Sequence, residues 1–491
     1  MKVKTLLATL ITLLSVTPHL SAQESPESVT VYVWQDHWHD RHHDRQQRRH
    51  GYLHFGEENQ VTFKPKGLVE AQYNFMDLSD SRSQLVGINP DLPFGSQDFL
   101  FDNPGTSYVS RFLARRVRFG FDLHLPDHWY ASVSLALDMF NGSYRYGNLR
   151  DYVDEAFIGK KVNWGLLNGN LKLGYTKVFF GMEEYTHISK LKMIERSLAN
   201  NYVNGFTQWD DDTGRPSGYV CTPLGIGNRH VGLQWQGKAN FVFSGFRYYL
   251  ALTSESFNPV RAGSSENYHR INFYAGLGYR AKWENSALNA GVNFNLSPNG
   301  IAYFPVEERR YSQLLAYNPY VRFQSDKLYV LAEAYWTDSE HGKFIKGGFG
   351  DADAPNRAAN SPTAYGFGGQ ATVAYDFEWI EPVARFSYLD TGGAGFSSGY
   401  VRDVIPDAPN DFETTNFDKG WTVGGGFNFT LVPDYLRLMV QYEFLNVTDD
   451  LNYRILMDSQ NTQVPADVVD KLFDDSKIEF HTVRVKMQLR F

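Results

Sequence analysis

Hydrophobic and polar residues alternate with a period of two along most of the chain, from Gln60 to the last residue. We mark about sixteen such segments, separated by turn-rich connections. In the last segment, Lys477 to Phe491, the two sets are clearest: Val483, Val485, Met487, Leu489 and Phe491 alternate with Thr482, Arg484, Lys486, Gln488 and Arg490. The pattern predicts β-strands with one face toward lipid and the other toward water.

The connections between these segments alternate between short and long. The short ones are Pro126-Asp127, Trp164 to Asn168, Gly237 to Asn240, Glu284-Asn285, Gln324-Ser325, Trp379-Ile380 and Val432-Pro433. The long ones are Asp77 to Ser107, Asn141 to Asn148, Val178 to Asn228, Ser254 to Tyr268, Ser297 to Arg310, Thr337 to Thr363, Thr391 to Phe417 and Val447 to Ser476. This alternation predicts an all-β fold, a transmembrane antiparallel β-barrel of about 16 strands, with both chain ends on the periplasmic, short-turn side.

The two ends of the chain suggest three parts. Residues 1–22 have the basic start, apolar run and small-residue site of a signal peptide, residues 23–59 form a His-rich periplasmic amino-terminal extension, and residues 60–491 form the barrel. No later run approaches the ~20 apolar residues of a spanning helix. The single cysteine, Cys221, excludes an intramolecular disulfide. Aromatic residues make up 15% of the chain, which favours strands over helices.

The third long connection has a pattern of its own. Ile188, Leu191, Ile194 and Leu198 recur at helical spacing, which predicts a short helix within a functional loop. The basic residues of this region are Lys177, Lys190, Lys192 and Arg196. If the loop folds into the lumen, these charges stand at the narrowest point; if it folds outward, they form only a solvated face.

Basic residues dominate the predicted lumen face. Strand parity directs twelve bases inward: Arg116, Arg118, Lys172, Arg247, Arg270, Arg280, Arg322, Arg385, Arg437, Arg484, Lys486 and Arg490. Four acids share that face: Asp122, Asp138, Glu333 and Glu443. The formal net charge of −8 arises mainly from acidic outer loops, so it does not contradict a basic lumen. Fixed cations in a low-dielectric wall concentrate anions, although the same arginines could simply pair with lumen carboxylates.

One strand fits the parity less well. Arg111 and Arg115 share the parity of Val109 and Leu113, which is the predicted lipid face. A β-bulge or a position high on the rim would accommodate them, and the sequence does not decide between the two.

Several short stretches resemble one known family in their order. They include Arg115-Arg116-Val117-Arg118, Leu149 to Asp154, Gly174 to Gly181, Met193 to Leu198, Arg229 to Gln234, Gly420 to Gly424 and Leu436 to Met439. Together they resemble the phosphate-selective porin O and P family. The resemblance implies a sixteen-stranded homotrimeric porin whose third loop enters the lumen and whose basic residues attract anions. The His-rich tract and the acidic outer loops depart from that pattern.

The remaining motifs carry little chemistry. His37, His39, His42, His43 and His50, with Asp36, Asp40 and Asp44, have the residue types of a Zn²⁺ or Cu²⁺ site, but their spacing favours a solvated or peptidoglycan-facing tail. Gly395 to Gly399 matches G-x-S-x-G without the strand-turn-helix context of a nucleophile elbow. We therefore expect no enzyme, metal or cofactor, although a Ser/His pair formed in space stays open.

The sequence thus predicts an outer-membrane porin for passive diffusion of small anions, phosphate or polyphosphate first. The predicted constriction consists of Lys177, Lys190, Lys192, Arg196, Arg116 and Arg118, and the predicted lumen wall of Arg270, Arg280, Arg322, Arg385, Arg437, Arg484 and Lys486. A porin for neutral solutes and a metal-binding or anchoring protein are the alternatives. The expected partners are small anions, outer-membrane lipid, and the barrel-assembly machinery through the strand that ends at Phe491, but no nucleic acid.

Overall fold

A computed structural model describes most of the predicted strands and part of the third connection. The described residues are 53–55, 61–77, 108–137, 153–164, 167–204, 208–209, 216–217, 224–239, 245–256, 271–298, 311–341, 364–392, 396–397, 416–450 and 477–491. The chain divides into two compact units, residues 1–64 and 65–491. In the first unit, β1 (Leu53–Phe55) pairs antiparallel with Val61 to Phe63.

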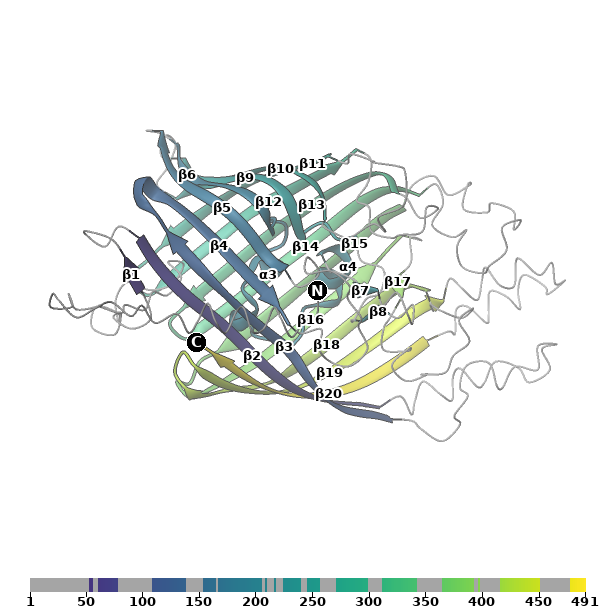
Figure 1. Cartoon of the computed structure of the whole chain (residues 1–491). Helices are drawn as coiled ribbons and strands as arrows, with labels where there is room; N and C mark the ends of the chain where they lie inside the picture. Colours follow the sequence, from purple (N-terminus) through teal and green to yellow (C-terminus); the bar gives the residue numbers. More distant parts are fainter. Residues whose placement is uncertain are drawn as a thin grey trace, which may run out of the picture. The chain divides into compact units, whose positions relative to one another are not determined.

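The second unit is a closed antiparallel barrel of sixteen long strands among the described residues (Figure 1). Each strand pairs with the next along the chain, and β20 pairs with β2 to close the sheet. The strands are β2 (Val61–Asp77), β3 (Tyr108–His124), β4 (Trp129–Ala136), β5 (Val153–Trp164), β6 (Leu167–Lys177), β9 (Arg229–Ala239), β10 (Phe246–Ser256), β11 (Ile271–Lys282), β12 (Ser286–Ser297), β13 (Tyr311–Ser325), β14 (Leu328–His341), β15 (Ala364–Tyr375), β16 (Ile380–Asp390), β18 (Asn416–Val432), β19 (Leu436–Asp450) and β20 (Lys477–Arg490).

Short strand pairs also occur beside the barrel strands. Residues Phe396–Ser397, the two described residues of the G-x-S-x-G stretch, form β17, which pairs with β18. Residues Gln208–Trp209 (β7) and Pro216–Ser217 (β8) form a separate two-stranded ladder. The predicted barrel of about sixteen strands is confirmed, and so is its order of short and long connections.

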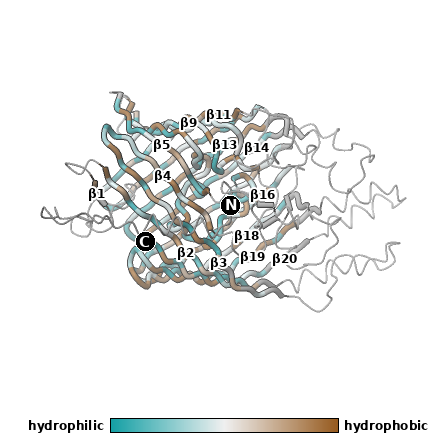
Figure 2. The backbone as a smooth tube through the Cα atoms, in the orientation of Figure 1, coloured by the Kyte–Doolittle hydropathy of each residue, from teal (hydrophilic) through white to brown (hydrophobic). Residues whose placement is uncertain are grey.

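The two faces of each strand differ in burial as the alternation predicts. On β20, Met487 and Leu489 are 48% and 44% exposed, while Lys486 and Gln488 are 0% and 4% exposed. The same alternation runs along the other strands (Figure 2). Because exposed apolar side chains cover one face and buried polar ones the other, the polar face is the inside of the barrel.

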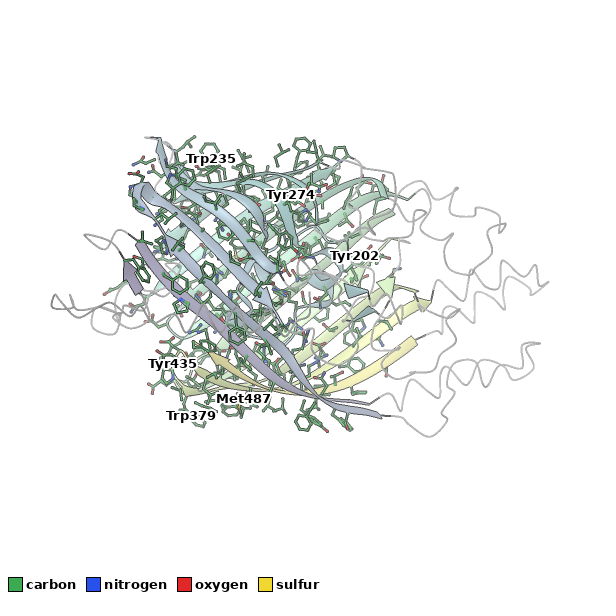
Figure 3. The ribbon with its side chains drawn as sticks, viewed as in Figure 1. Tyr202, Trp235, Tyr274, Trp379, Tyr435 and Met487 are labelled. Carbon is green, nitrogen blue, oxygen red and sulfur yellow. The ribbon has the colours of Figure 1, made fainter. Side chains whose placement is uncertain are left out.

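Aromatic side chains concentrate near the short connections. Trp283, Phe377, Trp379 and Tyr435 are all at least half exposed there. Trp379 and Tyr435 project from the end of the barrel where these turns lie (Figure 3). The arrangement is typical of an interfacial aromatic girdle. None of the helices within the described ranges has the length and apolar character of a membrane-spanning segment.

A buried carboxylate ties the first barrel strand to the last. Glu70 of β2 is 0% exposed and accepts hydrogen bonds from Arg116 at 2.7 Å, Lys486 at 3.2 Å and Gln488 at 2.5 Å. Backbone hydrogen bonds between Gly67 and Phe491 extend the same seam. Three strands, β2, β3 and β20, therefore meet at one charge cluster where the barrel closes.

The third connection begins with three short elements rather than one helix. Residues Met182–Tyr185 form helix α3, Ile188–Lys190 form a 3-10 turn, η5, and Leu198–Asn204 form helix α4. The predicted helix through Ile188, Leu191, Ile194 and Leu198 is therefore wrong, because the stretch from Leu191 to Ser197 is not helical. Its spacing instead reflects apolar side chains that pack separately, such as Leu191 beside Leu68 and Met193 beside Ala374.

Candidate functional site

Residues 178–204, which we call the inner segment, contact strands that are distant in the sequence. The Ile194 amide donates to Gln441 Oε1 at 2.6 Å, and Arg437 donates to the Leu191 carbonyl at 2.9 Å. Both partners lie on β19, on its buried polar face. The inner segment therefore lies against the inside of the barrel wall.

A second anchor joins the inner segment to β16 and β18. Lys192 forms an ion pair with Glu381, and Arg437 donates to the same carboxylate at 2.7 Å. Asn428 donates to both the Lys192 carbonyl and Glu381 at 2.9 Å. The Glu381 carboxylate is thus shared between one lysine of the segment and one arginine of the wall.

A third anchor is buried more completely. Arg385, whose side chain is 1% exposed, donates to Glu183 at 3.1 Å and to Glu443 at 2.8 Å. It also donates to the Glu195 carbonyl at 2.6 Å. Ser197 donates from its hydroxyl to Glu183 at 2.6 Å. Burying charged groups costs desolvation energy, which is offset only when the groups have well-placed partners. Arg385, Glu183 and Glu443 each have such partners here.

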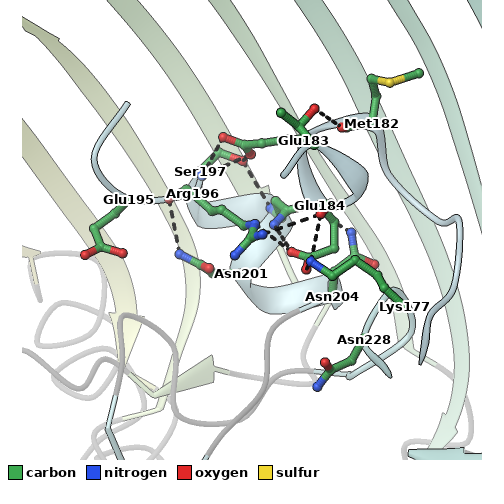
Figure 4. Close-up of polar contacts among 12 residues, drawn as sticks. Lys177, Met182, Glu183, Glu184, Glu195, Arg196, Ser197, Asn201, Asn204 and Asn228 are labelled. Carbon is green, nitrogen blue, oxygen red and sulfur yellow. Dashed lines mark hydrogen bonds and ion pairs between the residues drawn. The ribbon is translucent and has the colours of Figure 1, made fainter. Parts of the chain in front are cut away.

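Glu184 links two of the predicted constriction residues. Lys177 Nζ lies 2.6 Å from one carboxylate oxygen of Glu184, and Arg196 Nε lies 2.8 Å from the other. Asn200 donates to the same carboxylate at 3.0 Å. Figure 4 shows Lys177 and Arg196 converging on Glu184. The structure brings these two bases together, but around a carboxylate of the segment itself.

Glu195 forms the contact to β3. Arg115 donates to its two oxygens at 3.0 and 3.1 Å, and Arg116 lies 3.6 Å away. Burial alone would raise the pKa of Glu195, but Arg115 and Arg116 hold that pKa well below its ordinary value of 4.5. Arg115 therefore reaches the inner segment although its parity predicted the lipid face. The side chain of Arg111 lies outside the described residues.

Gly181 allows the inner segment to turn close to the wall. Its φ is 91°, and an added Cβ would lie 2.7 Å from the Tyr335 hydroxyl. Its amide donates to Asn318 at 3.1 Å. A residue with a side chain would be strained there and would push the segment away from β13 and β14.

A cluster of three arginines lies on the inner face of β10, β11 and β13. Arg247 on β10 is opposite Gly278 on β11, two residues from Arg280, and Asn289 of β12 pairs with both Arg280 and Arg322. Residues paired directly across strands share a face, so all three arginines point inward. We call Arg247, Arg280 and Arg322 the wall arginine cluster.

Most predicted lumen bases have a carboxylate partner in the structure. Arg118 pairs with Asp154 at 2.8 Å, Arg484 with Glu443 at 3.5 Å, and Arg490 with Asp434 at 3.3 Å. Lys172 lies over the Phe157 ring, at 4.7 Å from its centroid. Lys190 ends the turn η5.

Sequence reasoning underestimated the inner acids. It missed those of the strands and of the inner segment: Glu70, Asp154, Glu183, Glu184, Glu195 and Glu381. Glu70 and Glu381 do follow strand parity, so the sequence could have placed both among the inward-facing acids. The predicted excess of bases over acids on the lumen face would then have been smaller. The acids of the inner segment had no such signal.

Some predicted features lie outside the described residues. They include Arg270, Asp138, Cys221 and the His-rich tract at residues 36–50. Among the described residues, no group of three or more His, Cys, Asp or Glu side chains could hold a metal ion.

Comparison with known proteins supports the family resemblance over part of the chain. The sequence model of the family "phosphate-selective porin O and P" matches residues 87–269. No curated protein matches the sequence significantly.

Solved structures that align with the chain are outer-membrane barrels. OmpT of Vibrio cholerae is 9% identical and has a TM-score of 0.46 over 89% of this chain and 100% of its own. The outer membrane channel DcaP of Acinetobacter baumannii is 11% identical, with a TM-score of 0.47 over 89% and 99%. An anion-selective porin from Comamonas acidovorans is 9% identical, with a TM-score of 0.47 over 88% and 100%.

Proposed function

We propose that the chain is an outer-membrane porin that admits small anions by passive diffusion. The closed sixteen-stranded barrel and the match to a porin family support the porin part of this proposal. A barrel of this strand number encloses more space than its own side chains fill, so it accommodates a water path beside the inner segment. The inner segment narrows that path.

The wall arginine cluster is the observation that carries the anion preference. Arg247, Arg280 and Arg322 set three like charges side by side on one inner surface. Clustered cations on a low-dielectric wall raise the local anion concentration and repel cations. The name of the matching family suggests phosphate as one such anion.

The bases of the inner segment have a different role in this proposal. Lys177 and Arg196 pair with Glu184, and Lys192 pairs with Glu381, so each of these bases is held by an ion pair. We assign them mainly to holding the segment in place. Selectivity then comes chiefly from the wall. Arg116 belongs to the Glu70 seam, and Arg118 pairs with Asp154 of β5.

The reversal potential in a KCl gradient across a planar bilayer tests the proposal. Wild-type channels should give a potential of the sign expected for chloride preference. Replacing Arg247, Arg280 and Arg322 together by Gln should move the potential toward cation preference. A matched control replaces Lys160, Lys327 and Arg490 by Gln, three bases at the same end of the barrel but outside the cluster. Cation preference in the wild type, or an unchanged potential in the cluster variant, contradicts the proposal.

Diffusion of neutral solutes is the second candidate. Tyr329, a partly exposed aromatic residue on the inner face of β14, favours it, because aromatic rings pack against sugar-like and other uncharged molecules. Liposome swelling with neutral sugars and the reversal potential together separate the two candidates. A porin for neutral solutes admits the sugars but gives no reversal potential in the KCl gradient. Export through residues 1–22, insertion through the strand ending at Phe491 and assembly as a homotrimer stay predictions.

A further inference from the structure

Aromatic rings of the inner segment and of the wall pack together beside the wall arginine cluster. The ring of Phe179 lies 4.7 Å from that of Tyr185, 5.7 Å from Tyr249 and 5.8 Å from Tyr320, measured between centroids. A water-filled lumen is ordinarily polar. The four rings therefore form a packed aromatic surface between the inner segment and the wall, with Tyr249 and Tyr320 only 2% and 8% exposed.

Tyr329 extends this aromatic surface along β14. It packs against the cluster of Met182, Tyr320 and Leu331 and also against the cluster of Met193, Ala374 and Val383. The residue is partly exposed, and Lys192 Nζ lies 5.3 Å from the centroid of its ring. Arg322 is two residues from Tyr320 on β13, and its register partner Leu331 is two residues from Tyr329 on β14.

Tyr320 connects the aromatic surface to the arginines. A Cβ added at Gly291 would lie 2.7 Å from the Tyr320 hydroxyl, and one added at Gly278 would lie 2.9 Å from it. Gly278 is the register partner of Arg247 and is two residues from Arg280. The Tyr320 side chain therefore extends across Gly291 of β12. Its hydroxyl lies beside Gly278, the register partner of Arg247.

We propose that Arg247, Arg280, Arg322, Tyr320 and Tyr329 form a binding subsite for organic anions that carry a carboxylate on an aromatic body. We call these five residues the Arg–Tyr surface. Guanidinium groups match the two oxygens of a carboxylate, and the Tyr320 hydroxyl adds a donor. The Tyr329 ring packs against the aromatic ring of the solute. Inorganic phosphate can bind the guanidinium groups and the Tyr320 hydroxyl, but it has no apolar part to contact the Tyr329 ring.

This inference rests on the proposed anion-preferring porin and names its solute class. The test uses the full-length protein in planar bilayers at low salt, with benzoate, acetate and phosphate as inhibitors of chloride current. Benzoate should inhibit at a concentration at least about tenfold below that of acetate. A tenfold difference corresponds to about 1.4 kcal/mol, the range expected of one aromatic contact with its buried area.

Variants assign the preference to particular residues. Tyr329→Leu keeps an apolar side chain but removes the ring, so the advantage of benzoate over acetate should disappear. Tyr329→Phe keeps the ring and should retain it. Arg322→Gln should weaken inhibition by all three anions. Tyr317→Leu is the control, because Tyr317 is on the same strand as Arg322 but 42% exposed on the outer face.

Equal inhibition by acetate and benzoate in the wild type overturns the inference, as does stronger inhibition by phosphate than by benzoate. An unchanged benzoate advantage in Tyr329→Leu also overturns it. If that variant does not fold, as judged by heat-modifiable migration, the wild-type comparison decides by itself. Chloride preference without a benzoate advantage rejects only the subsite, whereas cation preference in the KCl gradient rejects the proposed function as well.

Discussion

Arg385 of β16 and Glu183 of the inner segment form a buried ion pair, with 3.1 Å between Nη1 and Oε1, across 202 positions of the chain. The other side of the same guanidinium pairs with Glu443 of β19 at 2.8 Å. One arginine therefore holds the inner segment to two strands of the wall, and the width of the lumen at this level depends on it.

Arg385→Gln should loosen this attachment. The change leaves Glu183 without its wall cation, and removing one partner of a buried ion pair costs about 3–5 kcal/mol. We expect a higher single-channel conductance and a lower denaturant midpoint. Lys419→Gln is the control, since its 3.8 Å pair with Asp390 involves a lysine that is 43% exposed, and such pairs contribute about 1 kcal/mol or less. Wild-type conductance in Arg385→Gln would show that the anchor does not limit the lumen.

Glu70→Gln should weaken the closure of the barrel. The substitution removes the charge that compensates Arg116 and Lys486, both buried, so we expect a loss of about 3–5 kcal/mol. Heat-modifiable migration in gels should be lost at a lower temperature than in the wild type. Asp434→Asn, which removes an exposed partner of Arg490, should leave that temperature unchanged. A similar shift in both variants would argue against a special role of the seam.

Replacing Lys190, Lys192 and Arg196 together by Gln compares the inner segment with the wall. Lys192 and Arg196 already pair with Glu381 and Glu184, and removing them leaves each carboxylate with one base, Arg437 or Lys177. We expect a smaller shift of the reversal potential than in the wall arginine cluster variant, together with noisier current as the segment loosens. A larger shift of the reversal potential than in the wall arginine cluster variant would show that the inner segment determines the anion selectivity.

Acid should release the inner segment only well below neutral pH. Arg115 and Arg116 hold the pKa of Glu195 below its ordinary value of 4.5 despite burial. A depressed carboxyl pKa adds stability that is complete above the unfolded pKa and is lost as the pH falls through the folded one. Protease resistance of the segment should therefore be constant from about pH 8 to 5 and decrease below about pH 4. Far-ultraviolet circular dichroism over the same range controls for loss of the barrel, and a decrease between pH 7 and 5 would contradict the assignment.

Alternation of side chains by itself determined the barrel. Met487 and Lys486 are adjacent in sequence yet 48% and 0% exposed, because successive side chains of a strand point to opposite faces. This local rule predicts strand number, connection order and the inward direction of Arg280 or Arg385 without any knowledge of their neighbours.

Only the tertiary structure decided what the inward charges do. Glu183 and Arg385 are 202 positions apart, and no local pattern specifies that the inner segment brings its acids to the wall bases. The ion pairs of Lys177, Lys192 and Arg196 follow from the path of an irregular segment, whose contacts are set by packing rather than by periodicity. The grouping of Arg247, Arg280 and Arg322 depends on strand register, which the sequence pattern leaves free by steps of two residues.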